Sequence, residues 1–491
     1  MLKKSALIGI FCLFFFLVRS LYLKDFPPWP DEAVFVDIAL NLLNTGKMGT
    51  GLWEHIFPHI DAHAYWYPPT YFYMIAGWIK LFGVNPSTLR LLPLIASTVL
   101  LWFLYLTLNQ IDSLKKTWIP HIILVGVILA NPFLSISRIT RPEIFVLCFS
   151  MIAIYFYLRS LNEEKNKNKF LIFSGLASAA TFLMHFLGIY VAIAIGLHFL
   201  FTQKLKTFTN KSFYLYGVAV AIPVLLGMIP LLMNIPIVLE QLAIVSERKG
   251  MELPQLFVVI LQGNLWDKCI YLFYFFILGW FLYLSFIKKN TIYLFLSITL
   301  ILTWIFSTYG QMGNYMVYPV VFTYIALAIC MVESKERMSI VFFFVYCILT
   351  MTHMFNFMTS LARMGWSDGY YDRYTKIVLE TIPDNKTVFL ISIPDPYFAF
   401  KMNNRNNKLY QYPYMPTSYD NYLKQLNTSD YIVFTGSYDG IVFGRFLIDY
   451  IQSNQVKMTP VKVLDKDAFI IELKPASART VLPAYDQYLS Q

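Results

Sequence analysis

Charged residues are scarce in this sequence of 491 residues. Lys, Arg, Asp and Glu together make up 14% of it, whereas a soluble domain carries about 25%. Short segments of alternating hydrophobicity, which a membrane-spanning strand barrel needs, are also missing. Apolar runs of about 18 residues or more recur instead, each long enough to cross a bilayer as a helix. The composition therefore predicts an α-helical polytopic membrane protein.

Cysteine is rare and is not placed for structural cross-links. The five cysteines all lie in apolar segments, at Cys12, Cys148, Cys269, Cys330 and Cys347. None lies in the polar C-terminal part, so we infer no disulfide framework and no thiolate metal site. The net charge of +10 comes from Lys and Arg in short connections between apolar runs. That placement gives topology information and predicts no nucleic-acid partner.

Eleven membrane spans are predicted from the apolar runs. They cover residues 5–23, 88–108, 118–136, 143–160, 170–186, 188–203, 213–233, 269–287, 291–308, 315–333 and 338–358. Alternate connections are short and basic, such as those around Lys115 and Lys204. By the positive-inside rule these connections and the N-terminus are cytoplasmic. The long first loop, residues 24–87, and the tail after the last span are then extracytoplasmic.

The first outer loop and the tail have structural patterns of their own. Apolar residues recur at helical spacing over Asp31–Asn44 and Thr70–Phe82, which predicts two helices lying at the membrane surface. In the tail, 387–393, 431–435 and 468–473 have strand patterns, and 418–426 and 445–453 have helical patterns. The sequence thus predicts a transmembrane domain, residues 1–358, and a small extracytoplasmic α/β domain, residues 359–491.

Two adjacent acids, Asp31 and Glu32, are the first candidate catalytic residues. They follow the rigid segment Pro27–Pro30, just after the first span. An acid before a helical run is often only a helix cap. Here the pair lies at the outer bilayer surface, where an ionised carboxylate is costly without a partner or a role. The location therefore favours a function over the cap alone.

Arg138, Arg141 and Glu143 form a second polar group, at the outer ends of the third and fourth spans. Arginine suits a phosphate because its guanidinium donates two parallel hydrogen bonds. The group is therefore a candidate anion site beside a third acid. The alternative is structural: arginines that extend to the membrane interface, and a glutamate that starts a helix after Pro142.

Three histidines, His55, His59 and His63, recur every four residues in the first outer loop. Their spacing, with acids nearby, resembles a set of metal ligands. Pro58 argues against one continuous helix, so the spacing need not place the three rings on one face. Solvated or substrate-contacting histidines are the favoured alternative.

Taken together, these motifs resemble those of the membrane glycosyltransferases of the GT-C fold, especially the group with the protein O-mannosyltransferases and the aminoarabinose transferase of lipid A. The resemblance rests on Asp31-Glu32, Tyr67-Pro68-Pro69, Arg90, Arg141-Pro142-Glu143, and Asn314-Tyr315 with Pro319. The order of these motifs is fairly specific for the superfamily and weak for any one substrate.

The resemblance implies an inverting transfer of a sugar from a polyprenyl-phosphate donor at the outer face. Asp31 would be the general base, with Glu32 and Glu143 assisting or positioning substrates. A lipid phosphate is already a good leaving group, so the chemistry needs a base near the acceptor hydroxyl and cations near the phosphate. Arg138 and Arg141 are the candidates for these cations.

Two positions depart from the family pattern. Relatives often carry Lys where this chain has Tyr67, and a basic residue where it has Asn314, next to Tyr315. Tyr67, Asn314 and Tyr315 are the remaining candidate donor contacts. The structural alternatives are anchoring at the membrane interface for the aromatic segment around Tyr67 and an ordinary helix start for Asn314 and Tyr315. Both departures affect the phosphate contacts and point to a different donor head group.

We therefore expect a glycosyltransferase in a bacterial inner membrane, with a lipid, glycan or protein as the hydroxyl acceptor. No cofactor is required, and a divalent metal at the histidines is the one cofactor considered. The rival is a transporter or flippase of lipid-linked saccharides, for which broken helices and acids near mid-membrane are typical. Here the acids cluster at the outer surface, which favours the enzyme. A non-catalytic scaffold is the third alternative.

Overall fold

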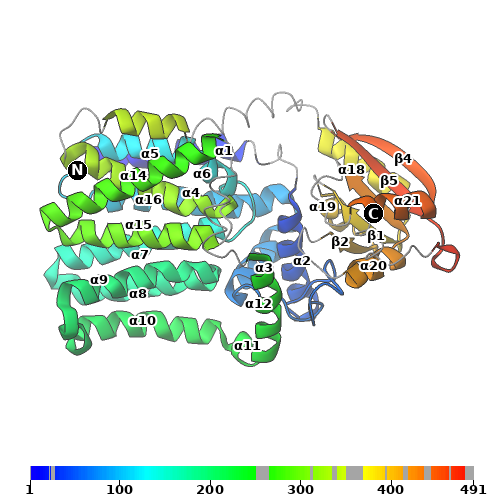
Figure 1. Cartoon of the computed structure of the whole chain (residues 1–491), viewed down its shortest axis with the longest axis horizontal. Helices are drawn as coiled ribbons and strands as arrows, with labels where there is room; N and C mark the ends of the chain where they lie inside the picture. The colour runs from blue at the N-terminus through cyan, green and yellow to red at the C-terminus, as the bar shows by residue number, and fades with distance from the viewer. Residues whose placement is uncertain are drawn as a thin grey trace.

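The computed structural model has a bundle of long helices at one end, a small α/β domain at the other, and shorter helices between them (Figure 1). It describes residues 2–21, 23, 28–249, 265–309, 313–333, 340–349, 369–392, 395–412, 419–435, 444–463 and 466–480. The predicted boundary between residues 358 and 359 lies outside these ranges.

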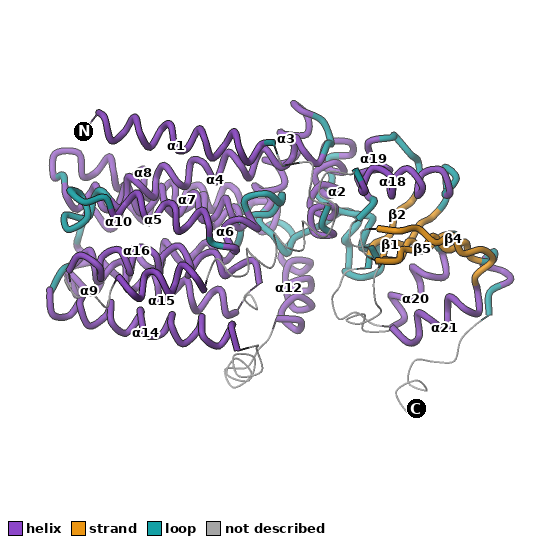
Figure 2. Tube along the Cα trace, turned by 90° about the horizontal axis from the view of Figure 1, so that it is seen from above, coloured by secondary structure: helices purple, strands orange, loops and turns teal. Residues whose placement is uncertain are grey.

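The bundle is built from apolar helices that run side by side (Figures 1 and 2). They are α1 (Leu2–Ser20), α4 (Pro86–Leu108), α5 (Ile119–Leu129), α7 (Glu143–Asn162), α8 (Lys167–Met184), α9 (Tyr190–Gln203), α10 (Lys211–Gly227), α14 (Leu265–Lys288), α15 (Thr291–Tyr309) and α16 (Val317–Glu333). Among the described residues, four stretches are helical, long and apolar enough to cross a membrane: Pro86–Leu108, Glu143–Asn162, Phe186–Thr209 and Thr291–Thr308. The number of spans stays a prediction, and the predicted span 338–358 lies mostly outside the described residues.

Proline divides two of the predicted spans. The apolar run 118–136 is two helices, because α5 ends at Leu129 and α6 (Asn131–Ile136) starts with Pro132 in its first turn. Proline has no N–H to donate within a continuous helix, so it favours a new helix start. The run 213–233 is divided similarly, since α10 ends at Gly227 and α11 (Ile229–Leu232) follows with Pro230 in its first turn.

Three helices lie between the bundle and the C-terminal domain: α2 (Pro30–Thr45), α3 (Pro69–Phe82) and α12 (Ile235–Lys249) (Figures 1 and 2). The first two confirm the helices predicted in the first outer loop. Each starts with a proline, which needs no N–H partner at the first helical position. Gly46 ends α2 with φ of 74°, a left-handed conformation that glycine adopts without strain.

Helix α12 fixes the irregular loop between α2 and α3 through one buried side chain, Gln241. Its Oε1 accepts from the Tyr65 N–H at 2.8 Å. Its Nε2 donates to the carbonyl oxygens of Pro58 at 2.8 Å and His63 at 2.6 Å. Three hydrogen bonds to loop backbone leave this segment little freedom, although it has no regular structure.

The C-terminal domain has a five-stranded sheet of order β2-β1-β3-β5-β4. The strands are β1 (Thr387–Ile391), β2 (Lys408–Gln411), β3 (Tyr431–Thr435), β4 (Gln455–Val463) and β5 (Lys466–Leu473). Strand β1 pairs in parallel with β2 and β3, and β5 pairs antiparallel with β3 and β4. The three predicted strands are confirmed as β1, β3 and β5, whereas β2 and β4 were not predicted.

Helices cover both faces of this sheet (Figure 2). They are α18 (Tyr370–Thr381) and α19 (Tyr397–Met402) on one face, and α20 (Tyr419–Thr428) and α21 (Gly444–Asn454) on the other. The last two confirm the predicted helices at 418–426 and 445–453. Phe389 and Ile391 of β1 share a buried core with Tyr422 and Leu426 of α20, as expected for alternate residues of a strand facing one side.

Asp395 is a fully buried acid where the C-terminal domain meets the first outer loop. Its backbone N–H donates to the Pro28 carbonyl at 3.0 Å, and its Oδ2 accepts from Gln411 Nε2 at 2.6 Å. Burial raises the pKa of Asp395 from 3.8 to about 7, although hydrogen bonds from Tyr397 and Gln411 act in the opposite direction.

The raised pKa predicts a pH-dependent stability. The folded protein holds the Asp395 proton more tightly than the unfolded chain does, so this stabilisation is fully present below about pH 4 and is lost as the pH rises through about 7. Over this range the free energy of unfolding falls by at most about 1.4 kcal/mol per pH unit. We expect the thermal midpoint of the unmodified protein to fall relative to that of Asp395→Asn between about pH 5 and pH 8. A difference that does not change with pH would contradict this expectation.

Candidate active site

Helices α2 and α3 lie at the end of the bundle that faces the C-terminal domain (Figure 1). Polar side chains of α2 contact the loop before α7 there. Asp31 lies in the first turn of α2. Unpaired backbone N–H groups at a helix N-terminus stabilise a negative charge there. The Asp31 side chain is 38% exposed, so a substrate hydroxyl can reach it.

Arg141 joins two of the predicted catalytic acids. Its Nη1 pairs with Asp31 Oδ2. Its Nη2 and Nε donate to Glu143 Oε1, at 2.6 and 3.1 Å. The Glu143 side chain is fully buried and that of Arg141 is 8% exposed, so Asp31 is the accessible one of the two carboxylates. The geometry makes Glu143 the residue that orients Arg141, and Arg141 the residue that holds Asp31.

Glu32 lies one residue further along α2 but points into a different, buried network. Its Oε2 accepts from Arg90 Nη2 at 2.7 Å and from the Trp29 N–H at 3.1 Å. Its Oε1 accepts from Arg90 Nε at 3.0 Å and from the Thr140 N–H at 2.9 Å. Each of the two carboxylate oxygens therefore accepts two hydrogen bonds. This bonding suits Glu32 to tying α2, α4 and the loop before Arg141 together.

Tyrosines surround the Arg141–Glu143 pair. Tyr67, Tyr71 and Tyr318 are buried and lie within electrostatic range of Glu143. Tyr67 also hydrogen-bonds with Tyr315, and burial raises the pKa of Tyr67 well above its usual value. Its phenol therefore stays protonated and can donate. In the described part of the chain, the hydroxyls of Tyr71 and Tyr318 are buried without a hydrogen-bond partner.

His185 belongs to this group although the sequence did not indicate it. Its ring meets that of Tyr67 edge-on, with centroids 4.8 Å apart. Its Nδ1 accepts from the Leu187 N–H at 3.0 Å, so the neutral ring carries its proton on Nε2. That Nε2 lies 3.4 Å from the Tyr315 hydroxyl. A single histidine at the end of an apolar helix gives no signal by spacing or composition.

The three predicted histidines do not converge. His55 and His59 sit in left-handed backbone conformations, with φ of 72° and 58°, which break the four-residue repeat. His63 Nδ1 hydrogen-bonds with the Tyr65 hydroxyl at 2.9 Å, and His55 Nε2 lies 3.9 Å from a Glu54 oxygen. In the described ranges, no three His, Cys, Asp or Glu side chains are grouped as metal ligands.

Arg138 and Asn314 are the two remaining predicted donor contacts. Arg138 is half-buried in the loop before α7, within electrostatic range of Arg19, Arg90 and Glu32. Burial lowers the pKa of Arg138 to about 9, so it stays charged at neutral pH. Asn314 lies in the short helix η4 (Gly313–Met316), and its side chain is outside the described part of the structure.

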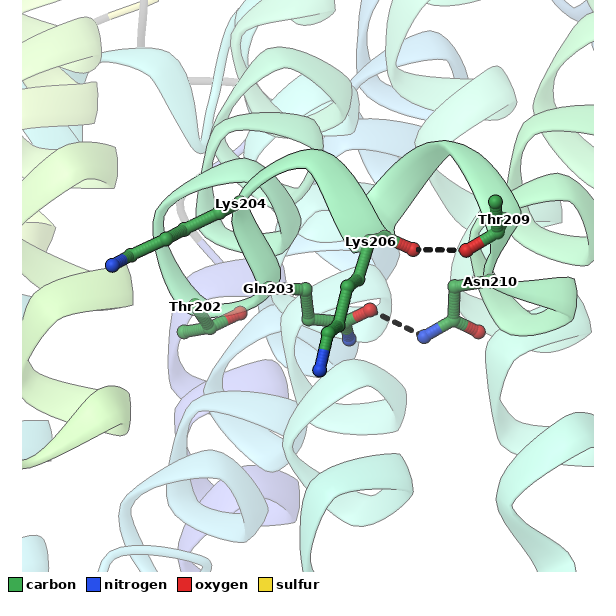
Figure 3. Close-up of a pocket in the computed structure, with 6 residues that line it drawn as sticks. All are labelled: Thr202, Gln203, Lys204, Lys206, Thr209 and Asn210. Atoms are coloured by element: carbon green, nitrogen blue, oxygen red, sulfur yellow. Dashed lines mark hydrogen bonds between the residues drawn. The ribbon is translucent and has the colours of Figure 1, made fainter.

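A cavity of about 590 Å³ is lined by Thr202, Gln203, Lys204, Lys206, Thr209 and Asn210 (Figure 3). These residues belong to the link η3 (Lys204–Thr209) and its flanks. The link joins α9 to α10 at the end of the bundle away from α2 and the C-terminal domain (Figure 1). The cavity is therefore separate from the cluster around Asp31.

Comparisons with known proteins bear on the fold and the enzyme class. The sequence model of the family described as dolichyl-phosphate-mannose-protein mannosyltransferase matches residues 67–232. ArnT from Cupriavidus metallidurans, bound to undecaprenyl phosphate, aligns with a TM-score of 0.54 and 11% identity over 97% of this chain and 99% of that chain. The chain is a glycosyltransferase of the GT-C fold.

A second glycosyltransferase of this fold is also similar. The Archaeoglobus fulgidus oligosaccharyltransferase, in complex with Zn and sulfate, aligns with a TM-score of 0.50 and 15% identity over 85% of this chain and 67% of that chain. Comparison with curated proteins finds no match. The fold and enzyme class expected from the sequence motifs are thereby confirmed. The matched region includes Tyr67, Arg141, Glu143 and His185 and begins after Asp31.

Proposed function

We propose that this glycosyltransferase moves a sugar from a polyprenyl-phosphate donor to a hydroxyl acceptor at the outer face of a bacterial inner membrane, with inversion at the anomeric carbon. The acceptor is a lipid, a glycan or a protein. Residues 1–358 form the catalytic membrane domain and residues 359–491 the extracytoplasmic domain. One observation carries the proposal: Asp31 is the exposed carboxylate, held by a guanidinium that a buried acid orients.

Asp31 is the general base in this proposal. It takes the proton of the acceptor hydroxyl as the acceptor oxygen bonds to the anomeric carbon. The bond between that carbon and the phosphate oxygen breaks, and polyprenyl phosphate leaves with the electron pair. The Arg141 guanidinium stabilises the charge that grows on the leaving phosphate, and Glu143 keeps the guanidinium in place.

Further donor contacts come from residues around this centre. The hydroxyls of Tyr67 and Tyr315 lie by Arg141 and Glu143 and can donate to phosphate oxygens. Arg138 and Asn314 complete the proposed donor contacts, with Arg138 adding positive charge at the rim. Glu32 is the positioning acid, because both its oxygens are already occupied.

The outward orientation is supported by where the charges lie. The N-terminus and the link with Lys204 and Lys206 are at one end of the bundle, and α2 is at the other (Figure 1). Basic connections face the cytoplasm. An active site at the opposite end then faces outward, where the donor lipid presents its head group.

The residues around Asp31 do not fit a divalent metal. The space between the Asp31 and Glu143 carboxylates, where a cation would bridge them, is taken by the Arg141 guanidinium. The histidines His55, His59 and His63, the other metal candidates, are proposed as solvated or acceptor-contacting groups. We therefore expect transfer to persist in excess EDTA, measured as initial rates before and after chelation. Loss of transfer that Mg²⁺, Mn²⁺ or Zn²⁺ restores would contradict this expectation.

Transfer from radiolabelled undecaprenyl-phosphate sugars in proteoliposomes tests the function. We expect label to move from the lipid fraction to an acceptor, with one polyprenyl phosphate released per sugar. Inversion is read from the anomeric configuration of the product. Movement of the lipid-linked sugar across the bilayer without transfer from any donor would overturn the proposal in favour of a transporter.

A further inference from the structure

The C-terminal domain contacts the membrane domain with one edge of its sheet. Strands β1 and β2 are parallel, so both carboxyl ends lie at that edge. Beyond β1, the Asp395 N–H donates to the Pro28 carbonyl at 3.0 Å, and at the end of β2 the Gln411 N–H donates to the Leu52 carbonyl at 2.9 Å. In open α/β sheets this edge is where ligands bind; here the first outer loop occupies it.

Gln411 is the centre of this contact, and its side chain is buried. Its Nε2 donates to the Pro30 carbonyl at 3.0 Å and to Asp395 Oδ2 at 2.6 Å. Its Oε1 accepts from Trp53 Nε1 at 3.2 Å. The Pro30 carbonyl belongs to the peptide unit that joins Pro30 to Asp31. One side chain of the C-terminal domain therefore holds the backbone next to the base.

A second contact holds the same helix two turns further on. Asp37 of α2 accepts from the Tyr397 hydroxyl at 2.8 Å and from Thr50 Oγ1 at 2.6 Å. Lys401 Nζ lies 3.5 Å from the same carboxylate. Together with Pro28 and Pro30, Asp37 gives the C-terminal domain contacts on both sides of Asp31, while Arg141 holds the Asp31 carboxylate from the bundle.

We propose that the C-terminal domain is a positioning part of the active site, in which Gln411 sets the place of Asp31 relative to Arg141 by holding the Pro30–Asp31 peptide unit. This inference rests on the proposed role of Asp31 as the base. Gln411 touches no reacting atom in this proposal; it acts through the start of α2. A base displaced by about 1 Å can lose on the order of 10²-fold in rate, so such a contact matters for turnover.

The first test compares Gln411→Leu with Gln425→Leu. Gln425 is a matched control because it is equally buried in the same domain and donates to the same loop, at the Glu54 carbonyl, but among the described residues its side chain has no hydrogen bond to α2 or Asp395. We expect Gln411→Leu to lower kcat by about 10-fold or more with the donor KM unchanged. The acidic limb of its pH–rate profile should move to higher pH, because an aspartate that loses its guanidinium ionises less readily. Gln425→Leu should change neither.

A second pair of variants tests the same proposal with smaller changes, in case Gln411→Leu does not fold. Tyr397→Phe removes only the hydroxyl bonded to Asp37 and keeps the ring. Tyr410→Phe is its control, since the Tyr410 hydroxyl reaches Glu54 at 3.5 Å and not α2. We expect a smaller fall in kcat for Tyr397→Phe, in the same direction as for Gln411→Leu, and none for Tyr410→Phe. Equal kcat values for both tyrosine variants, with both folded, would overturn the proposal.

Hydrogen exchange separates this inference from the proposed function, because it needs no substrate. The amides of Glu32 and Ala33 donate to the Trp29 carbonyl in the first turn of α2. We expect their exchange to speed up at least several-fold in Gln411→Leu and to stay unchanged in Gln425→Leu. Unchanged exchange in Gln411→Leu would overturn the positioning role even if the enzyme is active. A failure of the unmodified protein to transfer sugar, with exchange faster in Gln411→Leu only, would overturn the proposed function alone.

Discussion

Replacement of Asp31 by asparagine is expected to lower kcat for sugar transfer by about 10²- to 10⁴-fold, the range that a positioned general base contributes. Asparagine keeps the size of the side chain, and its amide oxygen can still accept from Arg141. It cannot take the proton of the acceptor hydroxyl. The donor KM should change little, because in our proposal the donor phosphate is held by Arg141 and the tyrosines. Initial rates in proteoliposomes measure both quantities.

The control for this change is Asp372→Asn, the same substitution at an exposed residue in the first turn of α18. It should leave kcat unchanged. Full transfer by Asp31→Asn would show that Asp31 is not the general base. Glu143, which is buried behind Arg141, would then be the next residue to test. A fall in both kcat and thermal midpoint would instead show that Asp31 supports the fold through its pair with Arg141.

The helices on either side of the site could be predicted because their signals are local. Helix α2 has a Pro-Asp-Glu start, helical spacing and a terminal glycine, all within residues 30–46. The strands β1, β3 and β5 are buried runs of β-branched and aromatic residues. Strand β2, with four residues and a Lys-Leu-Tyr-Gln sequence, is too short and polar for such a signal.

The pairing within the site could be predicted only in part. Asp31, Arg141 and Glu143 were chosen for residue type and position at the outer surface, and the structure brings them together. The separate network of Glu32 was not expected, because its partner Arg90 is 58 residues away in the sequence. The role of a buried side chain such as Gln411, which bonds to several segments, cannot be predicted from the sequence for the same reason. The partners of Gln411, the Pro30 carbonyl and the side chains of Trp53 and Asp395, come from separate segments, and nothing in the sequence next to a glutamine marks it as buried.

The Glu32–Arg90 pair is expected to give the largest change in stability. Both side chains are buried, with 2% and 1% exposed. Removing one partner of a buried ion pair leaves an uncompensated charge and costs about 3–5 kcal/mol. We expect a loss of this size for Glu32→Gln, measured as the free energy of unfolding in detergent. The control is Glu164→Gln, which breaks the exposed pair with Lys167 and should have no measurable effect.

A double variant separates the two roles of this pair. Glu32→Leu with Arg90→Met removes both charges, so it should recover most of the stability that either single change loses. It should not recover turnover, because the Thr140 N–H, one residue before Arg141, has then lost its acceptor on α2. If stability and kcat recover together, the pair serves the fold alone. If stability returns and kcat stays low, the Glu32 carboxylate has a second role, which is to set the distance between Asp31 and the Arg141 guanidinium.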